Sequence, residues 1–192
     1  LEFIELAEVP FSPKTIEGVL LEIGVRTDRK KLTEKGLLSN LRSLYHPDQR
    51  LLMINGGLSK GQENFLMGRE IAFQWLKLKG RPLSTPPYGE YSFEEILNNY
   101  KASYFSAALL MPQQEVIADI EKFASLPTWQ PEQFIALTSQ YDATPEMVMQ
   151  RLTNILPTFF KLKSMFFLRI LHSGGNYYLT KELHLSNQHS PY

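Results

Sequence analysis

The sequence lacks cysteine altogether, has only four histidines and contains no long apolar run. Without cysteine the chain forms neither disulfides nor thiolate metal sites. No segment approaches the roughly 20 apolar residues that a membrane-spanning helix needs, and no charged-then-apolar leader opens the chain. The histidines lie too far apart to supply the i, i+4 pair of a helical zinc site: His46, His172, His184 and His189. These absences favour a cytoplasmic globular protein that does not enter a membrane.

An excess of charge of either sign is also absent, because 20 Lys and Arg residues balance 20 Asp and Glu residues. A module that neutralises several DNA phosphates usually carries a clear excess of basic residues. We therefore expect that this chain is not the main DNA-reading unit of any DNA-binding protein to which it belongs. Because the first residue is Leu1 rather than Met, we expect the chain to be part of a longer protein.

The segment FLMGREIAF, from Phe65 to Phe73, has the outline of a metallopeptidase helix without its histidines. In an H-E-x-x-H helix two histidines one turn apart hold zinc, and the glutamate between them acts as general base. Here the two ligand positions hold Arg69 and Phe73, and only Glu70 remains. A guanidinium stays protonated at neutral pH and a phenyl ring has no lone pair, so neither side chain coordinates a cation.

A second segment, NYKASYFSAALLMP from Asn99 to Pro112, resembles the second helix of the ImmA/IrrE family of bacterial metallopeptidase-like domains. In that family the leading residue of this helix is a glutamate that serves as the third zinc ligand. Asn99 takes that position here, whereas the packing positions still agree with the family: Phe65, Ala102, Phe105, Ala107, Leu109, Leu110, Met111 and Pro112. The resemblance covers roughly residues 37 to 115. It implies a zincin-like scaffold that has lost all three metal ligands.

The segment from Lys163 to Lys181 is similar to a region of the short-chain fatty acyl regulators, which are bacterial transcription factors. That resemblance implies three things: an XRE-type helix-turn-helix domain before this chain that binds DNA, a degenerate peptidase-like middle, and an effector such as acyl-CoA. The sequence departs from the pattern at Leu171, where the family tends to place an acid.

These patterns together predict an α+β fold with three parts. Residues 1–125 form a mostly helical, zincin-like ImmA/IrrE domain with a small β-sheet, residues 126–158 form a helix-turn-helix-like pair, and residues 159–192 begin a β-rich sensor domain. The turn residues from His172 to Asn176 predict a β-hairpin. Since an isolated hairpin is only marginally stable, we expect further strands or a second copy of the chain to complete its sheet.

Local signals predict several element boundaries. Ser59 with Gln62, and Ser92 with Glu95, form capping boxes that begin two helices. We expect the first of these helices to run to Leu78 or Lys79, and we expect loops over 26–35 and 81–91. Other expected elements are a helix from Pro13 to Glu22, a strand from Leu51 to Ile54, a helix from Gln113 to Ala124 and a helix that begins at Thr144.

Several side chains are candidates for binding a ligand. Arg69 either pairs with a carboxylate on the second helix, Glu94 or Glu95, or binds an anionic ligand, since a buried charge requires a partner. Phe73 is expected to fill the former metal cavity. A basic cluster beside phenylalanines could bind the phosphates of coenzyme A: Lys161, Lys163 and Arg169. The simpler alternative is that these basic residues point outward from a strand.

Two functions of different classes follow. In the first, the chain is the metal-free regulatory part of a transcription factor, is not an enzyme, and senses a ligand and dimerises. In the alternative it is an active zinc metallopeptidase that uses Glu70 with altered ligands, namely Asn99 with Glu94 or Glu95. The first is favoured because a lone general base leaves most of a hydrolytic barrier in place. The helical pair either packs against the peptidase-like part or reads DNA through Gln150, Arg151 and Asn154.

Overall fold

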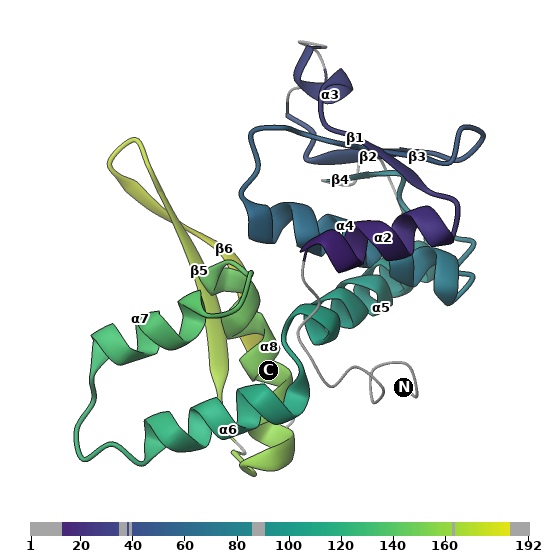
Figure 1. Cartoon of the computed structure of the whole chain (residues 1–192). Coiled ribbons are helices and arrows are strands. Elements are labelled where there is room, and N and C mark those ends of the chain that lie inside the picture. The colour runs from purple at the N-terminus through teal and green to yellow at the C-terminus, as the bar shows by residue number, and fades with distance from the viewer. Residues whose placement is uncertain (1–12, 35–37, 39, 86–90, 163, 185–192) are drawn as a thin grey trace.

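The computed structural model describes residues 13–34, 38, 40–85, 91–162 and 164–184. Figure 1 shows two groups of elements, an α+β unit that contains the N-terminal half of the described chain and a second unit that carries the C-terminal helices and a hairpin. The first unit contains α2 (Pro13–Glu22), β1 (Arg26–Asp28), α3 (Lys31–Glu34), β2 (Ser43–His46), β3 (Leu51–Ile54), α4 (Lys60–Trp75), β4 (Ser84–Thr85) and α5 (Phe93–Leu110). The second contains α6 (Gln113–Ala124), α7 (Pro131–Ser139), α8 (Pro145–Phe159), β5 (Phe166–Ser173) and β6 (Asn176–His184).

The sheet of the first unit has four strands in the order β1-β3-β2-β4. Strand β3 pairs in parallel with β1 and antiparallel with β2, and β4 extends β2 on its other side. All four residues of β3 are buried, as its apolar sequence predicts. The expected loops over 26–35 and 81–91 were wrong in part, because they contain β1, α3 and β4. Such short edge strands are held by backbone pairing, so their side chains show no alternation that a sequence pattern could detect.

The helix α4 begins at its predicted capping box and ends earlier than predicted. The Ser59 hydroxyl accepts from the Gln62 amide, and the Gln62 side chain accepts from the Ser59 amide. At the other end Leu78 N donates to Phe73 O and Lys77 N donates to Gln74 O, which is the bonding pattern of a Schellman motif. The motif places Lys77 at a φ of 51°, a position that glycine usually occupies. Because lysine rather than glycine stands there, no residue before Gly80 marks the end of the helix in the sequence.

Helices α4 and α5 cross at close range where Gly68 faces Ser106. A Cβ atom added to Gly68 would lie 2.5 Å from Ser106 Oγ and 3.4 Å from Ser106 Cα. The Ser106 hydroxyl donates to the Phe65 carbonyl at 2.8 Å, across the helix interface. The capping box at Ser92 and Glu95 is present as predicted. The close crossing brings the former metal positions on the two helices together.

The second unit packs on the first through α8 and the loop before it. A Cβ atom added to Gly61, in the first turn of α4, would lie 2.8 Å from the Asp142 carbonyl oxygen. Helix α8 buries Val148, Leu152 and Ile155 in the main core. Arg151 is only 2% exposed and its Nε donates to the Met111 carbonyl at 3.3 Å. The side chain of Arg151 is therefore directed into the protein and is not free to read DNA.

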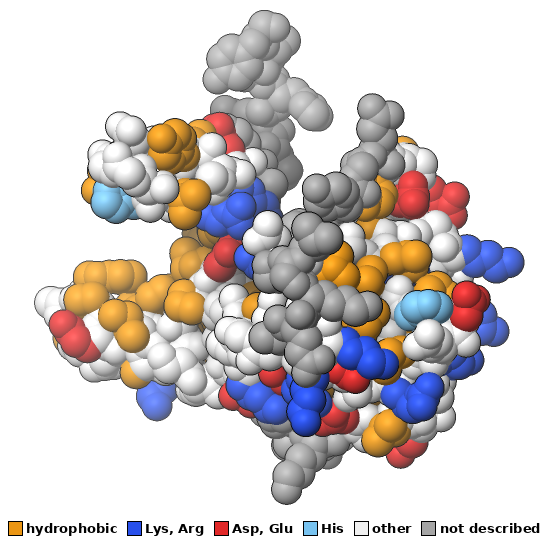
Figure 2. All heavy atoms as spheres, turned by 90° about the horizontal axis from the view of Figure 1, so that it is seen from above, with side chains coloured by type: hydrophobic (Ala, Val, Ile, Leu, Met, Phe, Trp, Pro, Cys, Tyr) orange, Lys and Arg blue, Asp and Glu red, His pale blue; other side chains and the backbone are white. Residues whose placement is uncertain are grey.

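The predicted hairpin is present, and much of its apolar surface is open. Gly174 and Gly175 form the turn at positive φ, and the register shifts between Arg169 and Ile170. Figure 2 shows hydrophobic side chains open to solvent on this arm of the molecule. The exposed apolar residues of the hairpin are Phe166, Leu168, Ile170, Leu171, Tyr177, Tyr178 and Leu179. Among the described residues, no helix has the length and hydropathy required to span a bilayer.

Candidate functional site at the degenerate metal position

The first and third metal-ligand positions lie in direct contact, although neither holds a metal ligand. Arg69 Nη2, on α4, donates to Asn99 Oδ1, on α5. Arg69 Nη1 donates to Thr85 Oγ1, on β4, at 3.0 Å. The expected pairing of Arg69 with Glu94 or Glu95 was wrong: the carboxylate of Glu95 instead accepts from Ser92, in the capping box. The Glu95 carboxylate therefore caps its own helix. Both hydrogen-bond partners of Arg69, the Thr85 hydroxyl and the Asn99 amide, are neutral.

The surviving glutamate, Glu70, is bound to a cation that sequence reasoning missed. Arg81 Nη1 donates to Glu70 Oε1 at 2.9 Å, and Arg81 Nη2 donates to Glu70 Oε2 at 2.5 Å. Gln74 Nε2 also donates to Glu70 Oε1, at 2.7 Å. Glu70 is 2% exposed. Both oxygens of the potential general base are therefore engaged by a bidentate ion pair, the strongest form of carboxylate recognition by a side chain.

The Arg81 guanidinium also lies on the aromatic ring that replaces the second histidine. Its central carbon is 3.9 Å from the centroid of the Phe73 ring and 4.6 Å from that of Tyr45. A guanidinium on an aromatic face gains a cation–π interaction that strengthens when the pair is shielded from water. Phe73 and Arg81 together thus place apolar volume and a fixed organic cation beside Glu70. No sequence signal marks Arg81, because it stands between Gly80 and Pro82 in a segment that reads as a loop.

The buried charges at this position do not cancel. Arg69 is 7% exposed, and its charge has no carboxylate partner because Glu70 is engaged by Arg81. Burial, and then the charge of Arg81, lowers the pKa of Arg69 to about 10, against a smaller opposing effect of Glu70. Among the described residues Arg69 Nε has no hydrogen-bond partner. One positive charge therefore remains uncompensated.

The residues at this position do not fit the zinc ion that the peptidase resemblance implies. Zinc binds imidazole, thiolate or carboxylate groups. The three positions hold a guanidinium, a phenyl ring and a neutral amide, and the carboxylate between them is ion-paired. The described part of the chain contains no group of three or more His, Cys, Asp or Glu side chains that could hold a metal.

The other predicted ligand residues lie elsewhere. Lys161 is exposed after α8 at a φ of 54°, and Lys163 lies outside the described residues. Arg169, on β5, forms an ion pair with Glu146 at 2.7 Å and donates to Thr180 Oγ1 at 2.8 Å. Of the predicted site residues, the structure therefore brings Arg69, Glu70, Phe73 and Asn99 together in one place. Arg169 is instead tied to the first turn of α8.

Restoring the ligands tests the proposed correspondence of positions. We expect Arg69→His with Phe73→His and Asn99→Glu to bind zinc only weakly, because Arg81 still holds Glu70 and covers position 73. Adding Arg81→Ala should increase zinc affinity about tenfold or more, which corresponds to roughly 1.4 kcal/mol. Calorimetric zinc titrations of the triple and quadruple variants measure the difference. Equal affinities, or no zinc binding by the quadruple variant, would contradict the correspondence.

Comparisons with known proteins place this geometry in a family. The family model described as the IrrE N-terminal-like domain matches residues 22–153, well over half of the chain. A solved structure described as a Mycobacterium tuberculosis transcriptional regulator is similar with a TM-score of 0.66 at 17% sequence identity. The similarity covers 98% of this chain and 54% of the regulator, so the chain spans about half the regulator's length and the likeness concerns the fold. A search of curated proteins gave no significant match. The chain therefore belongs to the IrrE N-terminal-like domain family.

Proposed function

We propose that this chain is the regulatory region of a bacterial transcriptional regulator of the XRE type. In this proposal the first unit is a metal-free, inactive pseudo-peptidase that acts as a scaffold for ligand sensing and dimerisation in the cytoplasm. DNA would be bound by a helix-turn-helix domain outside this chain. The family match and the fold shared with a transcriptional regulator support a regulatory role.

The observation that best supports an inactive peptidase-like unit is the bidentate ion pair between Glu70 and Arg81. A general base needs a lone pair within reach of the proton that it abstracts, and a metallopeptidase needs a metal-bound water beside it. Here both Glu70 oxygens are taken by Arg81, and the neighbouring ligand positions hold Arg69 and Phe73. The alternative of an active peptidase with altered ligands would require Arg81 to leave and Asn99 to bind metal together with Glu94 or Glu95.

Two surfaces support the sensing and dimerisation parts of the proposal. The hairpin exposes apolar residues on its strands, which a second copy of the chain or further strands could cover. The basic residues Lys161, Lys163 and Arg169 remain candidates for the phosphates of acyl-CoA. Arg69 is a separate candidate for an anionic group.

The test combines metal analysis with thermal stability. Protein incubated with zinc and then dialysed should retain far less than one zinc per chain, and it should cleave an unfolded protein substrate no faster than a Glu70→Gln variant. An acyl-CoA that binds the folded state should raise the melting temperature with concentration, since ligand at 100 times its Kd stabilises by about 2.7 kcal/mol. Stoichiometric zinc that is lost in Glu70→Gln would support the peptidase instead.

A further inference from the structure

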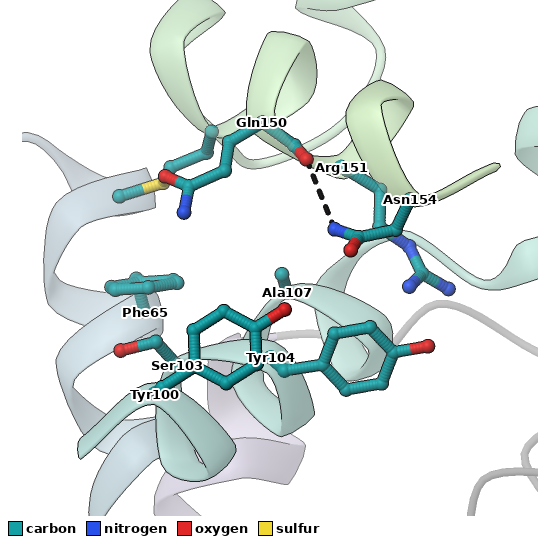
Figure 3. Close-up of a pocket in the computed structure, with 9 residues that line it drawn as sticks. Phe65, Tyr100, Ser103, Tyr104, Ala107, Gln150, Arg151 and Asn154 are labelled. Atoms are coloured by element: carbon teal, nitrogen blue, oxygen red, sulfur yellow. Dashed lines mark hydrogen bonds between the residues drawn. The ribbon is translucent and has the colours of Figure 1, made fainter. Parts of the chain in front are cut away.

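A groove runs between the two units, from Arg69 to the exposed face of α5. It consists of two hollows that share three lining residues, Phe65, Met147 and Gln150. The larger hollow, of about 140 Å³, is also lined by Arg42, Arg69 and Thr85. The smaller one, of about 40 Å³, lies against Tyr100 and Tyr104. Figure 3 shows this second hollow, with Phe65, Tyr100 and Tyr104 on one side and Gln150 and Asn154 of α8 facing them.

We propose that this groove binds a small organic anion, with its carboxylate or phosphate near Arg69 and its ring-sized apolar body between Phe65 and Met147. The proposal rests on the proposed ligand-sensing function and names the site and the chemical class of the ligand.

The arginines that line the larger hollow favour an anionic ligand. Arg69 is a buried cation whose partners, Asn99 and Thr85, are neutral. A buried charge without a counterion is strongly destabilising, so an anion supplied by a ligand would complete the site. Arg42 lines the same hollow and its guanidinium has no partner among the described residues. The single carboxylate in the lining, Glu146, is already paired with Arg169.

The size and lining of the hollow set the rest of the ligand. A protein cavity of about 150 Å³ holds a benzene ring, so about 140 Å³ accommodates a body of that size. Phe65, Leu66 and Met147 supply apolar walls, and the side-chain amide of Gln150 makes no hydrogen bond within the described structure. Gln150 lines both hollows and is placed to donate to or accept from a polar group on the ligand. The Tyr100 face beyond it leaves room for a substituent.

Because Arg69 is buried, we expect its replacement to weaken anion binding without lowering the stability of the protein. Because burial lowers its pKa to about 10, the folded protein holds the charged form of Arg69 at a cost below that pH. That cost is relieved only as the pH rises through about 10. The variant Arg69→Met should therefore fold at neutral pH with a melting temperature at or above that of the parent protein, while losing the anion site.

The experiment uses benzoate, phenyl phosphate, inorganic phosphate and neutral benzamide as probes in calorimetry and thermal shift at pH 7. We expect saturable binding of benzoate or phenyl phosphate, no binding of benzamide, and an affinity reduced at least tenfold in Arg69→Met. The matched control, Arg26→Met, removes an exposed arginine of β1 that does not line the groove, and it should bind like the parent. The two ring probes distinguish a carboxylate ligand from a phosphate ligand.

Three results would overturn the proposal: no saturable binding of either ring probe, binding unchanged in folded Arg69→Met, or inorganic phosphate binding as tightly as phenyl phosphate. Zinc content measured on the same preparation separates the two proposals. Stoichiometric zinc would contradict the proposed function, whereas a metal-free protein that ignores the anions would contradict the groove alone.

Discussion

Replacing Arg81 with methionine should destabilise the protein by about 3–5 kcal/mol, because the change leaves Glu70 buried without its cation. Glu70 is 2% exposed, and the Arg81 side chain is 11% exposed. Breaking one partner of such a buried pair costs more than the pair itself contributes, since the remaining charge is desolvated and unpaired. The loss of the guanidinium that packs on Phe73 and Tyr45 adds to this effect.

Urea unfolding of two further variants isolates the cause. The double variant Glu70→Gln with Arg81→Met should recover a large part of the loss, because no buried charge remains. Arg169→Met removes an arginine whose ion pair with Glu146 is nearly half exposed, and it should cost no more than about 1 kcal/mol. If the double variant is as unstable as Arg81→Met alone, packing rather than the uncompensated charge of Glu70 explains the loss.

Replacing Gly68 with alanine should destabilise the protein by about 1–3 kcal/mol, although alanine is the better helix former. The new methyl group would lie 2.5 Å from Ser106 Oγ and 3.2 Å from Ser106 Cβ. Turning the hydroxyl away would break its bond to the Phe65 carbonyl and would still leave α4 and α5 too close. The two helices must therefore move apart, and this movement also separates Arg69 from Asn99.

The matched control is the same substitution at Gly18, in α2, where an added Cβ meets nothing within 4 Å. Gly18→Ala should stabilise the protein by roughly 0.5–1 kcal/mol, since only the backbone entropy of the unfolded chain changes. Thermal unfolding of both variants gives the comparison, and Ser106→Gly should partly rescue Gly68→Ala. Similar shifts at Gly18 and Gly68 would show that the helix crossing tolerates the added methyl group.

The predictable parts of the structure are those that depend on residues close together in the sequence. The capping boxes at Ser59 and Ser92, the start of α8 at Thr144 and the hairpin turn at Gly174 each depend on side chains within a few residues of one another. The end of α4 was missed because Lys77 occupies a position that glycine usually marks. Strands β1 and β4 were missed because they are formed by backbone pairing with β3 and β2.

The candidate site could be predicted only in outline. The spacing of Arg69, Glu70, Phe73 and Asn99 identified the former metal position, and the structure brings Arg69 and Asn99 into contact. The partners that determine its chemistry, Arg81 and Thr85, come from the segment after α4. Their role depends on how that segment folds back over the helix. No periodicity or local motif encodes such a long-range contact.

The pair between Glu70 and Arg81 should make a zinc site hard to build at this position by single substitutions. Each first substitution toward a zinc site should lower the stability of the protein. Removing Arg81 leaves a buried carboxylate unpaired, and replacing Phe73 with histidine places an imidazole against a guanidinium. With a total folding free energy of typically 5–15 kcal/mol, a step that costs about 3–5 kcal/mol leaves little reserve. Arg81 therefore holds Glu70 and Phe73 in an arrangement that single substitutions toward a zinc site are expected to destabilise.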